Sequence, residues 1–251
     1  KAVEKRAPEV ARNLRNYLWG IFEYAIDSGL INANPVPSVR LMKKRQQINH
    51  ANLPPDRIGD LLRKLDGRTR LNESTRTAML LMMLTASRKS EVISGEWREI
   101  DLEAGSWEIP AERMKSNRDH WIPLSDQAIG LLRDLREQTP ADQELLFPNR
   151  RDPRRPMAGR TLNALMERLG YSGEGTPHGM RAAFSTHFNE EHAGGDETSK
   201  VGKEAVEYCL SHIPMGMTRA AYNRYTHKLE RRVILQDWAN HIDLLRASKP
   251  R

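Results

Sequence analysis

The sequence predicts a mainly α-helical protein with a small antiparallel β-sheet, an α+β fold. Apolar residues recur at three- and four-residue steps through most of the chain, as on one face of a helix. Strand-like alternation is confined to residues 99–110 and 120–125. Residues 41–55 are basic and polar and end in a proline pair, which indicates a linker. We therefore expect a small part over residues 1–47 and a larger domain over 48–251.

The small part is predicted to be one amphipathic helix over residues 7–29. Val10, Leu14 and Leu18 belong to its apolar stripe, and Gly29 is placed to end it. The following "INANPVPSV" is expected to be an extended turn, because residues before proline avoid the helical region. Residues 1–47 carry nine Lys and Arg against four Asp and Glu residues, so this part is strongly basic.

The larger domain is predicted to alternate helices with the short strands. We expect Gly105 to form the turn between strand-like runs, and residues 150–160 to form a loop rich in arginine and proline. Expected helices cover residues 56–66, 73–97 as one or two segments, and 126–138, with further helices starting near residues 161, 181, 203 and 217.

Composition favours a polyanionic partner, with nucleic acid first. The 251 residues include 40 Lys and Arg against 33 Asp and Glu, a formal charge of +7. Cys209 is the single cysteine, which excludes an internal disulfide and favours a reducing compartment. No apolar run is long enough to span a bilayer, and no signal peptide opens the sequence. Because the chain opens at Lys1 within a helical pattern, we expect a longer N-terminal part to precede it.

Two motifs in the first half of the domain place cations where an anion can bind. In "LTASRKSEVISGEW", Arg88 follows an apolar stretch, and a buried guanidinium there needs an anion. A simple pair with Glu91 is the structural alternative. In "PAERMKSNRDHWIPLS", Lys115 lies in a turn between strand-like segments. Lysine at this position can act as a mobile proton donor. The structural alternative is an ordinary solvated surface lysine.

Two further motifs lie in the second half. In "TPHGMRAAFSTHF", His178 and Arg181 are three residues apart across a helix start, a favourable seat for a phosphate. The alternative is a capping histidine and a surface arginine. In "CLSHIPMGMTRAAY", His212 is followed ten residues later by Tyr222, which taken alone would be a core residue.

Together these residues form a cation-rich set with no acidic cluster. A two-metal nuclease needs a cluster of carboxylates to hold its ions. A zinc site is also poorly supported, because the sequence offers one cysteine and two histidines that are far apart without ligand-like spacing. We therefore expect no metal and no cofactor. Such a set can stabilise a pentavalent phosphorus while a phenol attacks it.

The order of the motifs resembles the tyrosine recombinases, the phage integrase family, over nearly the whole chain. "FEYAIDSGLINANP" looks like the last helix and exit turn of the family's core-binding domain. "HGMRAAFSTH" and "AAYNRYTHKLERRVILQDWANHI" are most similar to integrases of satellite phages and genomic islands. "TASR" replaces the common Thr-Gly-x-Arg, and "LSH" replaces Leu-Ala/Gly-His. Neither change touches a catalytic side chain.

The resemblance implies a tyrosine recombinase catalytic domain over residues 48–251, preceded by the C-terminal part of a helical core-binding domain over 1–47. It implies a site-specific recombinase that integrates or excises a prophage or genomic island through a 3′-phosphotyrosyl intermediate, without metal or ATP. The implied catalytic residues are Arg88, Lys115, His178, Arg181, His212 and Tyr222. Tyr222 is favoured over Tyr225 because it lies in "AAYNR", which is similar to the family's nucleophile motif.

By the same resemblance the partners are double-stranded DNA at attachment sites and three further copies of the chain on synapsed DNA. A DNA-bending host factor and an excisionase are further expected partners, and the location is the bacterial cytoplasm, at the nucleoid, with no membrane. His120 is expected at the edge of the site, and "DWANHIDLL" is expected to pack on a neighbouring protomer. The expected DNA contacts are Arg15, Lys43, Lys44, Arg45, Arg118, Arg219 and Arg224.

Two other classes use overlapping features. A type IB topoisomerase shares the chemistry and relaxes supercoiled DNA without a recombination site. A non-catalytic DNA-binding regulator keeps the basic surface and forms no covalent adduct. The full set of catalytic residue types argues against the regulator, and the remnant of a core-binding domain argues against the topoisomerase.

Overall fold

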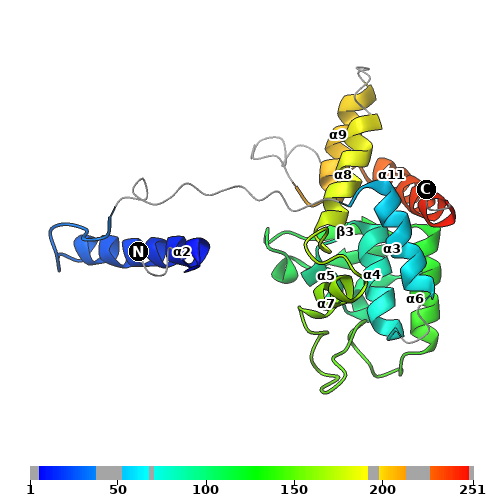
Figure 1. The fold of residues 1–251 in the computed structure, drawn as a ribbon, viewed down its shortest axis with the longest axis horizontal. Coiled ribbons are helices and arrows are strands. Elements are labelled where there is room, and N and C mark those ends of the chain that lie inside the picture. Colours follow the sequence, from blue (N-terminus) through cyan, green and yellow to red (C-terminus); the bar gives the residue numbers. More distant parts are fainter. Residues whose placement is uncertain (1–5, 38–52, 68–70, 192–197, 213–226, 249–251) are drawn as a thin grey trace. The chain divides into compact units, whose positions relative to one another are not determined.

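The computed structural model describes residues 6–37, 53–67, 71–191, 198–212 and 227–248. The chain divides into two compact units, Lys1–Asn49 and His50–Arg251 (Figure 1). The α-helices are α2 (Pro8–Asp27), α3 (Pro55–Gly67), α4 (Glu73–Thr85), α5 (Lys89–Ile93), α6 (Asp126–Glu137), α7 (Thr161–Arg168), α8 (Gly179–Glu191), α9 (Thr198–Cys209) and α11 (Lys228–Ala247). The strands are β1 (Ile100–Asp101), β2 (Ser106–Ile109) and β3 (His120–Pro123), and the short 3-10 helices are η2 (Trp97–Glu99) and η3 (Ala111–Arg113).

The first unit is built on α2, as the sequence predicts. Proline at the start of the helix has no N–H to leave unsatisfied. Gly29 ends the helix with φ +70°, and its N–H donates to Ile26 while the N–H of Leu30 donates to Ala25, the pattern of a Schellman motif. The apolar stripe of α2 stays exposed in this unit, with Val10 57% exposed.

The core of the second unit surrounds α4. Every residue from Thr77 to Thr85 is buried, in agreement with the apolar run in the sequence. Helices α5, α6, α7 and α11 all contact α4 (Figure 1). A helix that is apolar all round requires such an enclosed position. The predicted segment 73–97 is thus two helices, because Ala86 adopts a left-handed conformation (φ 48°) between α4 and α5.

The small sheet is the predicted one. Strands pair in the antiparallel order β1-β2-β3, with Trp107 opposite Ile122 in the β2–β3 register. Gly105 has φ +60° in the β1–β2 turn, a conformation that favours glycine. The turn begins with Asp101, whose carboxylate accepts N–H groups from the two residues Glu103 and Ala104.

Helix α11 changes the explanation of one sequence pattern. Its apolar face packs within the same chain, on α3, α4 and α9, so the apolar pattern is already explained without a neighbouring protomer, and contact with one stays a prediction. Trp238 is 2% exposed and its indole N–H donates to the carbonyl of Met83 at 2.8 Å. Leu235 and Ile242 are buried on the same face. Helix α9 also begins earlier than the expected residue 203, at Thr198.

No helix within the described ranges combines the length and apolar character that crossing a membrane requires.

The fold holds four segments around one another: the α4–α5 junction, the β2–β3 loop, the start of α8 and the end of α9. These segments carry the candidate site.

Candidate active site

Arg88 lies at the junction between the buried helix α4 and the short helix α5. The carboxylate of Glu91, whose side chain is 3% exposed, accepts both the backbone N–H and one guanidinium N–H of Arg88, each at 2.7 Å. Because the guanidinium has five N–H donors, this pair leaves most of them available. The predicted local pair therefore forms, and it orients Arg88 rather than consuming its hydrogen-bonding capacity.

Arg181 is brought to the same place from α8. It is 4% exposed, and its guanidinium donates to the carbonyls of Ala86, at 2.5 Å, and Leu210, at 2.7 Å. Burial, followed by the positive charge of Arg88, lowers the pKa of Arg181 to about 10, so the side chain is still charged at neutral pH. Among the described residues it forms no ion pair. A buried cation without a carboxylate is costly unless an anion joins it.

His212 lies two residues after Leu210, whose carbonyl accepts a hydrogen bond from Arg181. Ser211 has φ +52°, and the N–H of His212 donates to the carbonyl of Glu207 at 2.9 Å, which ends α9. The Nδ1 atom of His212 lies 3.1 Å from a carboxylate oxygen of Glu207. The side chain is 53% exposed. Glu207 therefore orients the imidazole while leaving it open to solvent.

His178 and Lys115 are both exposed, from different segments. His178 directly precedes α8, and its carbonyl accepts the N–H of Arg181 at 3.2 Å. The predicted His-x-x-Arg pair thus spans a helix start, as expected. Lys115 lies in the loop between η3 and β3, in agreement with its predicted turn position.

His120 lies deeper in the molecule than the edge position that its sequence suggests. It is 5% exposed, and burial lowers its pKa to about 3, with the charges of Arg231, Arg181 and Arg88 adding to the effect. It lines a cleft of about 520 Å³ together with Arg231 and the exposed Arg118. Histidine at this position is therefore a neutral side chain within a field of arginines.

Arg231 and Glu207 are residues of this region that the sequence reasoning missed. Arg231 is 3% exposed, and its guanidinium donates to the carbonyl of Trp121. Arg231 precedes Leu235 and Trp238 at helical spacing, so an arginine on the apolar face of a helix was the available signal. Glu207 stands five residues before His212, and no comparable pattern marks it.

Of the expected DNA contacts in the first unit, Arg15 is described. Its guanidinium lies 4.4 Å from the ring centroid of Trp19 and donates to the carbonyl of Pro37 at 3.0 Å. The residues that lie outside the described ranges are Lys43, Lys44, Arg45, Arg219, Tyr222, Arg224 and Tyr225. Within those ranges no three His, Cys, Asp or Glu side chains are grouped as metal ligands.

The candidate site thus contains two fixed arginines, Arg88 directly before α5 and Arg181 in α8, and two exposed histidines at helix ends. Sequence comparison then identifies the family. Residues 51–231 match the sequence profile of the phage integrase family, so the chain belongs to that family.

Curated relatives are similar over nearly the full chain. Prophage integrase IntA of Escherichia coli is 36% identical over 245 residues, which cover 96% of this chain and 56% of the relative. The integrase of Shigella phage Sf6 is 31% identical over 241 residues, 96% of this chain and 60% of the relative. The chain therefore spans little more than half the length of these relatives.

Solved structures share the fold. The Tn1549 transposon integrase in complex with circular intermediate DNA has a TM-score of 0.62 at 17% identity, over 87% of this chain and 76% of that one. A lambda integrase dimer bound to a core site has a TM-score of 0.61 at 19% identity, over 86% of this chain and 76% of the other. The α+β fold of a tyrosine recombinase catalytic domain, predicted from the sequence, is thereby confirmed.

Proposed function

We propose that this chain is the DNA-cleaving part of a site-specific recombinase that integrates or excises a prophage or genomic island. The observation that carries the proposal is the buried guanidinium of Arg181, which lies near Arg88 and forms no direct ion pair among the described residues, the charges of Glu91 and Glu207 acting on it only from a greater distance. Membership of the phage integrase family and the prophage integrases among its relatives support the same function.

The two arginines are suited to hold a phosphodiester. Each uses only part of its five N–H donors on protein partners, so the remaining donors can bind non-bridging phosphate oxygens. Their protein contacts fix them before DNA arrives, which is the condition for stabilising charge that develops in a transition state. His212 is the third group on the phosphate in this proposal, oriented by Glu207.

In the proposed reaction, the phenolic oxygen of Tyr222 attacks the scissile phosphorus as the bond from phosphorus to the 5′-oxygen breaks. Lys115 donates a proton to the departing 5′-oxygen, and His178 assists removal of the tyrosine proton. One phosphoester bond forms as one breaks, so rejoining to a partner strand needs no ATP. No metal ion is needed in this proposal because the two arginines and His212 stabilise the charge that develops on the phosphate. Attack of the partner's 5′-hydroxyl on the phosphotyrosine reverses the same steps.

The remaining expectations complete this proposal. Residues 1–47 belong to a DNA-clamping domain, and the basic residues outside the described ranges contact the duplex. Four copies act on two synapsed attachment sites at the nucleoid, with a DNA-bending host factor and an excisionase as accessory proteins. DNA-bound integrases with the same fold support DNA as the partner.

The test uses a nicked suicide duplex carrying the attachment core of the host element. The wild-type chain should give a protein–DNA band that survives SDS. Tyr222→Phe should bind the duplex in a gel shift and give no such band, whereas Tyr225→Phe should still give one. An adduct formed by Tyr222→Phe would contradict the assignment of the nucleophile.

The adduct assay and a plasmid-relaxation assay together separate the alternative classes. A non-catalytic regulator gives no covalent band with any variant. A topoisomerase relaxes a supercoiled plasmid that lacks an attachment core, and a recombinase that requires its site does not. Relaxation of such a plasmid at the rate of a plasmid carrying the core would therefore replace the recombinase proposal.

A further inference from the structure

The loop that carries Lys115 is exposed at its tip and fixed at its base. Met114 is 5% exposed within the core, and the residues from Lys115 to Asp119 are exposed. Across the base, the carboxylate of Asp119 accepts the N–H of Ala111 at 2.9 Å, and within the loop the N–H of Asn117 donates to the carbonyl of Met114 at 3.0 Å. The backbone position of Lys115 is therefore set by the residues that immediately precede it.

The residue that anchors this base most extensively is Arg113. Its side chain is 16% exposed and forms an ion pair with Glu99, whose side chain is 3% exposed. The second guanidinium nitrogen of Arg113 donates to the carbonyl of Glu91 at 2.8 Å and to the hydroxyl of Ser94 at 3.1 Å. One side chain thus joins the loop to the 3-10 helix η2 and to helix α5.

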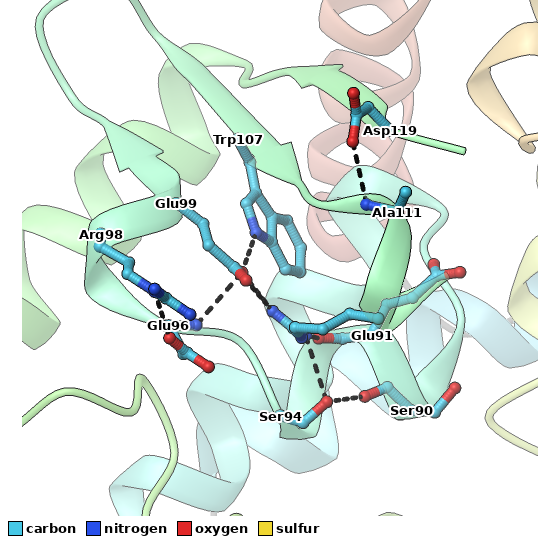
Figure 2. Close-up of polar contacts among 10 residues, drawn as sticks. Ser90, Glu91, Ser94, Glu96, Arg98, Glu99, Trp107, Ala111 and Asp119 are labelled. Atoms are coloured by element: carbon cyan, nitrogen blue, oxygen red, sulfur yellow. Dashed lines mark hydrogen bonds and ion pairs between the residues drawn. The ribbon is translucent and has the colours of Figure 1, made fainter. Parts of the chain in front are cut away.

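The partners of Arg113 are themselves held in place. The indole N–H of Trp107, which is fully buried, donates to Glu99 at 3.0 Å, and the hydroxyl of Ser94 donates to the carbonyl of Ser90 at 2.6 Å. Figure 2 shows these two pairs, with Glu99 against Trp107 on one side and Ser94 against Ser90 on the other. Arg113 bridges them, so its position is determined from both directions.

Glu91 makes this anchor relevant to the phosphate site. The carbonyl of Glu91 accepts a hydrogen bond from Arg113, and its carboxylate accepts one from Arg88. We infer that Arg113 is a positioning residue that holds the Lys115 loop in register with Arg88 and hence with the scissile phosphate. This inference rests on the proposed recombinase function and on the role of Lys115 as the acid.

The chemical identity of the residue supports positioning over simple stability. A buried ion pair can be replaced by well-packed apolar side chains without loss of stability. An arginine fork, in contrast, reaches acceptors on two separate elements at once, which the single ammonium of lysine does not. The contacts to Glu91 and Ser94 use that property, because they lie on a different element from Glu99.

The test compares two leaving groups in the suicide substrate, an ordinary 5′-oxygen and a 5′-bridging sulfur. A thiolate departs without a proton, so a defect in the general acid disappears with sulfur. The variants are Arg113→Lys, which keeps the charge beside Glu99 but loses the fork, and Lys115→Ala. Arg98→Lys is the matched control, because Arg98 pairs with Glu96 at the surface, with its side chain 77% exposed.

Displacing a catalytic group by about 1 Å can lower a rate about 100-fold. We therefore expect Arg113→Lys to cut the oxygen substrate about 10- to 100-fold more slowly than the wild type. It should cut the sulfur substrate within about threefold of the wild-type rate, as should Lys115→Ala. Arg98→Lys should resemble the wild type on both substrates. Ser94→Ala removes one acceptor from Arg113 without leaving a buried charge, and should show a smaller loss with the same dependence on the leaving group.

Three results distinguish what fails. Absence of any wild-type adduct overturns the proposed function. Lys115→Ala that is not restored by sulfur overturns Lys115 as the acid, and with it the positioning role. If sulfur restores Lys115→Ala but Arg113→Lys and Ser94→Ala lose equal activity on both substrates, the inference about Arg113 is wrong. Thermal melting of each variant identifies any that fails to fold, and Ser94→Ala then decides the outcome.

Discussion

Acidification should destabilise the second unit through His120. The imidazole of His120 is 5% exposed, and burial, with the charges of Arg231, Arg181 and Arg88, lowers its pKa from 6.5 to about 3. In the unfolded chain the same imidazole takes up a proton as pH falls through 6.5. The native state takes it up only near pH 3. The unfolded state therefore binds more protons over this window, and the free energy of unfolding decreases as pH falls from about 6.5 to about 3.

The size of the effect follows from the two pKa values. Between pH 7 and pH 5 the unfolded histidine becomes almost fully protonated while the native one stays neutral. One pH unit within the window corresponds to about 1.4 kcal/mol, so this single group should remove roughly 2 kcal/mol from the free energy of unfolding over that interval. That is a substantial part of the stability of an ordinary domain.

The measurement is urea unfolding at pH 7 and pH 5 for the wild type and for His120→Asn, which has no titrating ring. The wild type should lose roughly 2 kcal/mol more than the variant between the two pH values. Any general cost of the substitution is present at both pH values and cancels in this difference. An equal loss in the two proteins would refute the reasoning, because it would mean that His120 titrates alike in the folded and unfolded chain.

Two further predictions concern the phosphate site itself. Arg88→Ala and Arg181→Ala should each slow cleavage about 100- to 1,000-fold, because each removes a fixed donor from a developing charge. Their gel-shift affinity for DNA should change little, since affinity rests on many phosphate contacts, and an affinity loss as large as the rate loss would make them ordinary DNA contacts. Cleavage should also persist in excess EDTA, and loss that magnesium restores would contradict the metal-independent mechanism.

Local patterns in the sequence predicted most of the elements, for identifiable reasons. The β1–β2 turn follows from Gly105 between alternating runs, and the buried helix α4 follows from its continuous apolar residues. The docking of α11 within its own chain did not follow, because an amphipathic pattern specifies an apolar face and not the surface that covers it. The early start of α9 at Thr198, in contrast, follows Gly194, Gly195 and Asp196, residue types that are typical of a turn and of a helix start, so this boundary could have been predicted from the sequence.

Some contacts of the candidate site could likewise be predicted from the sequence, and others could not. The pair of Arg88 with Glu91 was predictable because it joins residues three apart at a helix start. The contacts of Arg181 were not predictable, because its acceptors are the backbone carbonyls of Ala86 and Leu210, which are distant in the sequence. Every residue type has a backbone carbonyl, so no sequence pattern marks these two. The lowered pKa of His120 was not predictable either, because it depends on burial and on the charges of arginines from three separate segments.

The packing of α11 has a consequence for biosynthesis. This last described helix closes the core against α3, the first described helix of its unit, and the contacts of Arg63 with Leu245 and of Asp66 with Arg246 join residues about 180 positions apart. Such contacts cannot form until α11 has left the ribosome. At about 5–20 residues per second, the α3 surface waits for roughly 10–40 s during synthesis. A nascent chain arrested before α11 would expose the face of α4 that Trp238 covers, and would be a target for chaperones and proteases before it met DNA.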